Sequence, residues 1–391
     1  MSYLSKGNLN DTDPVHQYLD INMVNNDTLG DKAPVRLVFN EIRSNPILSN
    51  PSEYFFSVMR FSLETVSLPL MIPQVQIGQI DPNKLIYSIT MTYTSPVNGI
   101  TYEQQNFILY VPQSKNQPTP NPPLVVQDFD PNGDYYFIYN FQYWIRLVNT
   151  TLARCLTDLN ATVFAATGAN LPSSNAPFME WDTVNNVAIL NADIAGFNST
   201  LTNPINIYFN TPLFTLFSSF VADYFGFTNI TNGKNYLIYI GNDNGTNSII
   251  LPTYTALQMY QDYPTAALWN PVNAIVFNTG TIPVLPSLVS APIILNSAVA
   301  SLTQGGNNAN ISNTLTDFEV PVTEGWEYKP NIFYAPSAEY RLVDLIGNTP
   351  ISNISINVFW KDSFANLHPF YLNSGCNANI KVLFRKKVFN Y

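Results

Sequence analysis

The sequence has little charge, little histidine and little cysteine. Only 11% of its 391 residues are charged, and it contains 2 histidines and 2 cysteines. Cys155 and Cys376 are too few for a disulfide framework, and neither lies in a CxxC or other metal-ligand spacing. No GxSxG, HExxH, Walker or dinucleotide-binding motif occurs. These absences argue against disulfide-rich secreted proteins and against the enzyme classes that carry those motifs, so we predict that the protein is not an enzyme.

Positive charge is scarce as well. The net charge is −10, which gives no broad basic surface for nucleic acid, and we expect no specific nucleic-acid binding. The one compact basic run is Arg385 to Lys387, close to the end of the chain. We interpret it as the solvated edge of a last strand, a device that discourages strand-to-strand aggregation. Contact with an acidic surface of a partner is the alternative.

Long apolar runs are missing too. The most apolar window, from Thr281 to Leu295, contains three prolines and is shorter than a membrane span, so we expect none. The first 22 residues hold no apolar stretch of the kind found in signal peptides. Together with the scarcity of cysteine, this predicts a protein made in a reducing compartment.

What the sequence does contain is typical of strands and turns. Aromatic residues make up 14% of the chain, and there are 29 prolines. In Leu85 to Thr94, apolar and polar residues alternate with a period of two, which predicts a half-buried strand. The same alternation in Ile351 to Trp360 and in Ala378 to Val388 predicts two further strands.

Two segments are predicted to be helical. Apolar residues recur at helical spacing from Phe141 to about Leu159. The second helix is predicted to start with Thr211 as N-cap and Pro212 in the first turn, and to end at Gly226. We expect both to pack on a β-scaffold.

The predicted fold class is mainly β, an antiparallel jelly-roll sandwich with two short helices. Short strands at regular spacing with Pro-rich connections favour this architecture. It is either a single jelly roll with a large α/β insertion or a double jelly roll. The expected organisation is an N-terminal arm and first strand over residues 1–45 and jelly-roll strands plus a helical insertion over 46–265. Residues 266–391 then form a second jelly roll or the returning strands of the first.

An acidic stretch from Asp128 to Phe137 resembles the start of an EF-hand calcium loop. Its oxygen-bearing side chains alternate, with Gly133 among them: Asp128, Asp130, Asn132 and Asp134. The twelfth position, however, is Tyr139 where a bidentate carboxylate is needed, and the approach is broken by proline. We predict a turn that leads into the first helix. A partial calcium site from Asp128, Asp130 and Asp134, completed elsewhere, is the alternative.

The histidines offer little catalytic chemistry. A Ser-His-Asp site would have to use His368, with Asp362 as its acid. Because His368 directly precedes a proline, we interpret it instead as an exposed turn residue.

Several stretches resemble one group of viral proteins. They are "SEYFFSVMRFSLETVSLPLMIP", "YFNTPLFTLFSSF", "NPVNAIVFNTGTIPV", "TDFEVPV", "YAPSAEYRLVDL" and "ISINVFWKDSFANLHPFYLNSGCNANIKVLFRKK". In order and character they resemble jelly-roll capsid proteins of the adenovirus, virophage and Polinton-like lineage of eukaryotic DNA viruses. The resemblance implies a virion structural protein, with a penton or minor capsid type ahead of a double jelly-roll major capsid protein. It also implies homo-oligomers (pentamers or trimers) and contacts with other capsid proteins. Apart from the possible calcium site, we expect no cofactor.

A carbohydrate- or receptor-binding β-module, such as a viral spike, is the alternative function. Exposed aromatic rings near polar groups would serve it. Trp144 and Trp360 lie on apolar stripes and are predicted to be core residues. Trp181, Trp269 and Trp326 are the candidates for such a surface.

Overall fold

The computed structural model divides the chain into two compact units, each described here by itself. Unit 1 comprises residues 1–68, 272–321 and 328–391, and unit 2 comprises 69–271 and 322–327. The described residues are 14–26, 35–76, 78–113, 122, 134–226, 233–242, 247–288, 293–296, 301–304, 311–320, 331–335, 341–363 and 365–387. Unit 1 is therefore discontinuous in sequence, whereas the expected ranges 46–265 and 266–391 are consecutive.

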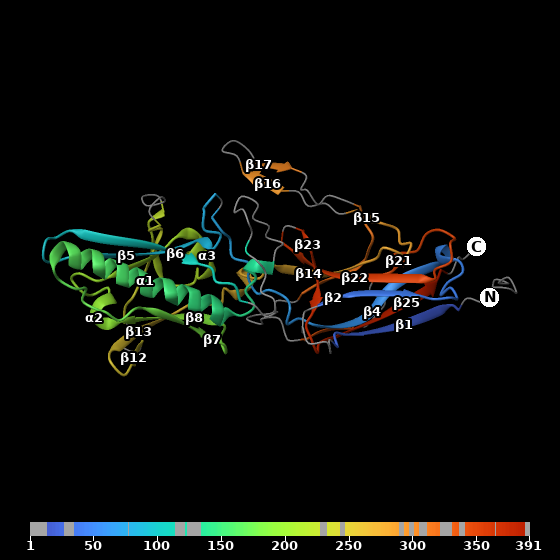
Figure 1. The fold of residues 1–391 in the computed structure, drawn as a ribbon, viewed down its shortest axis with the longest axis horizontal. Helices are drawn as coiled ribbons and strands as arrows, with labels where there is room; N and C mark the ends of the chain where they lie inside the picture. Colours follow the sequence, from blue (N-terminus) through green and yellow to red (C-terminus); the bar gives the residue numbers. More distant parts are fainter. Residues whose placement is uncertain are drawn as a thin grey trace, which may run out of the picture. The chain divides into compact units, whose positions relative to one another are not determined.

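Unit 1 contains two five-stranded antiparallel sheets (Figure 1). The first has the order β1 (His16–Val24), β25 (Asn377–Lys386), β4 (Tyr54–Glu64) and β20 (Asn331–Tyr334), with β21 (Val343–Asp344) also on β4. The second has the order β19 (Thr314–Glu319), β14 (Val272–Asn278), β22 (Asn353–Asp362) and β23 (Leu367–Pro369), with β3 (Val38–Ile42) also on β22.

The strands of unit 1 alternate between these sheets in the manner of a jelly roll. In chain order β1, β4, β20 and β25 belong to the first sheet, while β3, β14, β19 and β22 belong to the second. Two Greek keys of this kind give the eight-stranded jelly-roll sandwich. The ring centroid of Phe61 in the first sheet lies 5.3 Å from that of Phe277 and 4.7 Å from that of Phe318 in the second. The predicted fold class is confirmed, in its single form with an insertion between β4 and β14.

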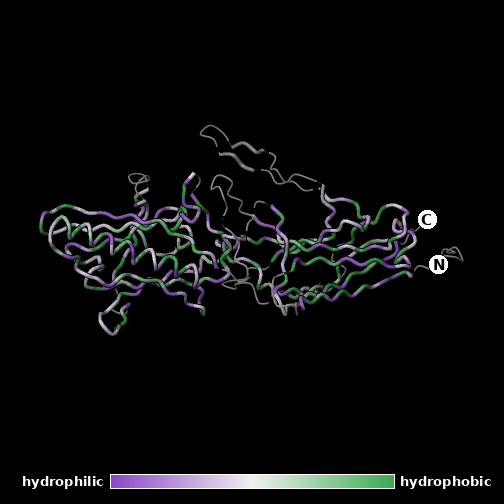
Figure 2. The backbone as a smooth tube through the Cα atoms, in the orientation of Figure 1, coloured by the Kyte–Doolittle hydropathy of each residue, from purple (hydrophilic) through white to green (hydrophobic). Residues whose placement is uncertain are grey.

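The alternation read from the sequence accounts for the core of unit 1. Ile354, Ile356, Val358 and Trp360 of β22 are all buried, as are Ala378, Ile380, Val382 and Phe384 of β25. Figure 2 shows apolar and polar residues alternating along these strands. Burying one face of each strand fixes its register, because a slip by one residue would move every apolar side chain to the opposite face.

Unit 2 has two further antiparallel sheets and the long helix α1 (Phe141–Thr167). One sheet has the order β10 (Ala222–Tyr224), β11 (Tyr236–Ile238), β9 (Asn206–Phe209), β5 (Lys84–Thr94) and β6 (Thr101–Leu109). The other has the order β12 (Ser248–Ile250), β13 (Thr255–Tyr260), β8 (Val187–Asp193) and β7 (Phe178–Asp182). In Figure 1, α1 runs between β5 and β6 on one side and β7 and β8 on the other. Its apolar stripe, including the fully buried Trp144, faces these strands.

The helices differ in extent from the prediction. α1 continues past Leu159 to Thr167, where Gly168 with φ 72° ends it. α3 spans only Thr211–Leu216, and its N-cap is Asn210, whose side chain accepts a hydrogen bond from the Leu213 amide. The predicted end at Gly226 is wrong, because the aromatic run after α3 turns into β10, which pairs with β11.

Strand β5 is buried more completely than predicted. Tyr87, Ile89 and Met91 are buried on one face, and so are Ser88 and Thr90 on the other. The strand is flanked by β9 and β6, and both α1 and α3 contact it. The polar residues of an alternating strand thus lie inside unit 2.

The remaining elements are short. Three pairs of strands are β2 (Val35–Arg36) with β24 (Tyr371–Leu372), β15 (Ser287–Leu288) with β18 (Ile311–Ser312), and β16 (Ile293–Asn296) with β17 (Ser301–Gln304). α2 (Ile194–Phe197) follows β8 directly. Within the described ranges, no helix is both long and apolar enough to cross a membrane.

Candidate functional sites

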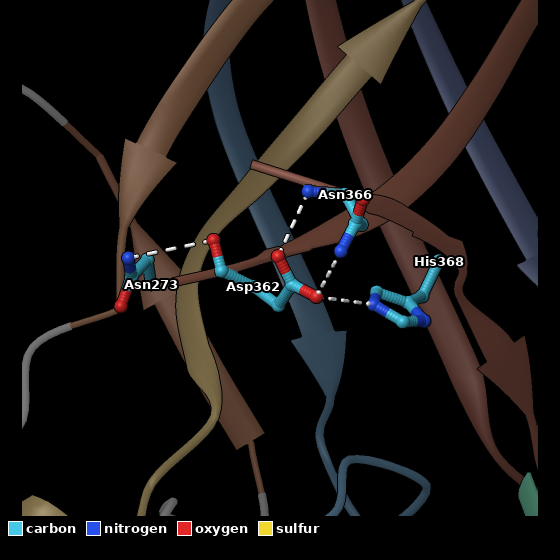
Figure 3. Close-up of polar contacts among 4 residues, drawn as sticks. All are labelled: Asn273, Asp362, Asn366 and His368. Carbon is cyan, nitrogen blue, oxygen red and sulfur yellow. Dashed lines mark hydrogen bonds and ion pairs between the residues drawn. The ribbon is translucent and has the colours of Figure 1, made fainter. Parts of the chain in front are cut away.

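The hairpin of β22 and β23 carries a buried polar cluster (Figure 3). Oδ2 of Asp362 lies 3.0 Å from Nε2 of His368. Asn366, in the turn between them, donates from its amide N to Oδ1 at 2.8 Å and from Nδ2 to Oδ2 at 2.9 Å. His368 is 2% exposed, and its ring stacks on Trp360 at 3.8 Å with an interplanar angle of 7°. The prediction of an exposed His368 is therefore wrong.

This cluster has no catalytic geometry. In the described part of the chain, no hydroxyl or thiol bonds to the His368 ring, and Nδ1 is buried without a hydrogen-bond partner. Burial by itself raises the pKa of Asp362, but hydrogen bonds from His368 and Asn366 outweigh it and hold the pKa below its ordinary value. The carboxylate thus stabilises the β22–β23 hairpin. Asn273, at the start of β14, also donates from Nδ2 to the backbone oxygen of Asp362 at 3.5 Å.

The predicted calcium ligands are only partly within the described chain. Asp128 and Asp130 lie outside the described residues, and Asp134 is the first residue of a short 3-10 helix, Asp134–Tyr136. The Tyr135 hydroxyl donates to Oδ1 of Asn83 at 2.7 Å. Among the residues that the structure describes, no three His, Cys, Asp or Glu side chains are grouped to hold a metal. The segment leaving the acidic stretch is anchored in unit 2 just before α1, and the calcium alternative stays a prediction.

The basic run near the end of the chain is not on a sheet edge. It lies in or directly after β25, which is paired on both sides by β1 and β4. Nζ of Lys386 is 3.3 Å from a carboxylate oxygen of Glu53, and Nζ of Lys387 is 2.8 Å from that of Asp344. The interpretation as a solvated edge is wrong, because β25 is paired on both sides and acidic groups of the same chain pair with these two lysines.

The predicted core tryptophans are confirmed, but the prediction of a surface tryptophan is wrong for Trp181 and Trp269, because both are buried. Trp144 and Trp360 are core residues, as predicted. Trp269 is also buried, with Nε1 donating to the backbone oxygen of Leu216 at 2.7 Å. Trp181 is 8% exposed and stacks on Phe141, and Trp326 lies outside the described residues.

Strand β1 is the long edge of the jelly roll, and sequence reasoning missed it. All nine residues pair with β25 without a register shift, and no described strand pairs with its other side. It contains no proline, lysine or arginine, which are the usual protectors of an edge. Its carboxylate, Asp20, is exposed and accepts hydrogen bonds along the face of the sheet, from Arg60 at 3.2 Å and from Asn379 at 2.9 Å. The alternating Leu19, Ile21 and Met23 were the available signal.

The described residues thus form a jelly roll with a large insertion, and comparison with known proteins shows to which family this architecture belongs. Residues 17–386 match the family model described as Sputnik minor capsid protein V18/19. The chain belongs to this family. As a member of the V18/19 family, it is a virion structural protein, located in the capsid, and not an enzyme.

Individual relatives agree with the family. The chain is 31% identical over 201 residues to structural protein V19 of Sputnik virophage. This alignment covers 50% of this chain and 88% of V19. It is 38% identical over 138 residues to protein V18 of the same virophage, covering 34% of this chain and 77% of V18.

Two solved structures share the fold. One chain of the Sputnik virophage cryo-EM structure has a TM-score of 0.75 and 30% identity, covering 96% of this chain and 98% of that one. The mavirus penton protein has a TM-score of 0.60 and 16% identity, covering 95% of this chain and 99% of that one.

Proposed function

We propose that the chain is a penton-type capsid subunit that assembles into a closed homo-oligomeric ring, a pentamer. The observation that carries this proposal is the single jelly roll. A double jelly-roll major capsid protein would need a second eight-stranded sandwich, whereas unit 2 is built from two separate sheets around α1. The fold shared with a penton protein supports the same position in the capsid.

The edge strand β1 is proposed to form part of the contact between copies. No described strand covers this nine-residue edge, and an uncovered edge strand is a template that aggregates or pairs with a partner. A two-fold pairing centred on the middle of β1 would place Asp20 opposite Asp20, and like charges directly opposite destabilise a sheet. This favours a head-to-tail contact with a different strand of the neighbour, which is the kind of contact that closes rings.

Lysines on β1 test this proposal. Tyr18 and Val24 are 55% and 62% exposed, so replacing both with lysine (Tyr18→Lys with Val24→Lys) removes little buried surface. We expect the variant to remain monomeric in analytical ultracentrifugation while its melting temperature stays within a few degrees of wild type, since lysine guards an edge. Val184→Lys, at an 85% exposed turn position, is the control and should still assemble. If the β1 variant assembles as wild type does, β1 is not in the contact.

A further inference from the structure

Arg146 is an uncompensated cation in unit 2. Between residues 69 and 271 the basic side chains are Lys84, Lys115, Arg146, Arg154 and Lys234. Lys234 pairs with Glu103, Arg154 donates to the backbone oxygen of Phe107, and Lys84 lies over the Phe107 ring, while Lys115 is outside the described residues. The Arg146 side chain is exposed on α1 and makes no hydrogen bond or ion pair with any described residue. Its charge is available to a ligand.

The arginine borders a recess of about 430 Å³ between α1 and β7. That volume lies within the range of small-ligand sites. Three buried apolar side chains form its floor: Ile145, Met179 and Trp181. The exposed residues Gln142, Arg146 and Glu180 add polar groups to the lining.

The walls of the recess are held in place before any ligand arrives. Asn149 of α1 donates from Nδ2 to the Met179 oxygen at 2.8 Å and accepts from the Met179 amide at 2.6 Å. The Trp181 ring stacks on Phe141 with centroids 4.4 Å apart. A preformed site avoids the cost of ordering its side chains on binding.

The geometry points to a saccharide ring with a single carboxylate, of the hexuronic acid class, as the ligand of this recess. The guanidinium of Arg146 presents a planar pair of donors that matches a carboxylate. The apolar floor suits the apolar face of a sugar ring. Oε2 of Glu180 accepts from Asn191 at 3.0 Å, and the negative charge of Glu180 beside the recess disfavours a second carboxylate.

This inference goes beyond the capsid role, since it assigns glycan recognition to the inserted unit. The main competing occupant is an acidic side chain of a neighbouring capsid protein. The volume of about 430 Å³ and the apolar floor favour a ring over a single flexible carboxylate side chain, and the two occupants give different results in the test below.

The test uses the full chain and two simple probes. Saturation-transfer NMR with methyl β-D-glucuronide should show binding, and methyl β-D-glucoside should bind at least about tenfold more weakly because it lacks the carboxylate. Arg146→Gln should weaken glucuronide binding by about tenfold or more, whereas Glu180→Gln should leave it unchanged or strengthen it. Arg43→Gln is the charge-matched control, because Arg43 lies in unit 1 and pairs with Glu41.

Three results would overturn the inference. They are equal binding of the two glycosides, an Arg146→Gln variant that binds as wild type does, and a loss of oligomer in Arg146→Gln with no detectable glucuronide binding in wild type. The last result would assign the recess to a protein neighbour. A monomeric wild-type protein that still discriminates the glycosides would leave this inference standing while removing the proposed ring.

Discussion

Asp362 shows how a single buried carboxylate is kept charged inside the jelly roll. It is 6% exposed, yet hydrogen bonds from Asn366 and the contact with His368 stabilise the ionised form. The sequence named this Asp–His pair only as a remote catalytic possibility. It could not show the burial, because that depends on Trp360 and on the pairing of β22 with β23.

Replacing this carboxylate should be costly. Asp362→Asn puts an amide where charge-assisted hydrogen bonds are made, and we expect it to lower the free energy of unfolding by about 1.5–3 kcal/mol at pH 7. Asp20→Asn is the matched control, because its ion pair with Arg60 is exposed and should be worth less than about 1 kcal/mol. Urea denaturation of both variants checks this, and equal losses would contradict a special role for Asp362.

The same variant predicts a pH dependence. A carboxyl whose pKa is lowered on folding stabilises the native state above its unfolded pKa, near 3.8, and loses that effect as pH falls through the folded value. The stability difference between wild type and Asp362→Asn should therefore be constant from pH 7 to about 5 and shrink below about 4. Denaturation curves across this range measure it. A difference that shrinks already between pH 7 and 6 would contradict this assignment to the Asp362 carboxyl.

At the scale of elements, sequence periodicity predicted the strands and the helix whose buried face is visible in their own apolar spacing. β22, β25 and the start of α1 follow from alternating or helical apolar spacing. The elements that the sequence did not predict are those whose conformation depends on pairing with another segment of the chain. β1 is a strand because β25, at the other end of the chain, pairs with it, and the segment after α3 becomes β10 because β11 is its neighbour.

The acidic stretch gives a prediction about calcium. Because Tyr139 occupies the position of the bidentate ligand, we expect a turn, and millimolar calcium or a chelator should leave the melting temperature unchanged. Scanning calorimetry with and without calcium checks this. A rise in melting temperature that Asp130→Asn abolishes would instead support the partial site of Asp128, Asp130 and Asp134.

At the scale of the whole molecule, composition and strand spacing were enough for a jelly roll but not for the number of sandwiches. The segments around Val58–Pro73 and Ala274–Pro286 look alike in sequence. Their strands, β4 and β14, belong to opposite sheets of one sandwich, with unit 2 inserted between them. Local sequence could not distinguish this from two sandwiches, because strand order is set by pairing between distant segments.

For the candidate sites, the sequence predicted the role of the protein but not the position of the recess. The family resemblance supplied the capsid role, which the match over residues 17–386 confirms. The recess beside Arg146 was not predictable beyond the suggestion of Trp181, because it needs α1 and β7 to be placed side by side.

Native mass spectrometry of the purified full chain tests the central claim most directly. A pentamer of the 43.8 kDa chain (five times 43.8) has a mass of 219 kDa, and a trimer (three times 43.8) has 131.4 kDa. We predict the 219 kDa species. A monomer at all concentrations, or a trimer, would contradict a penton-type ring.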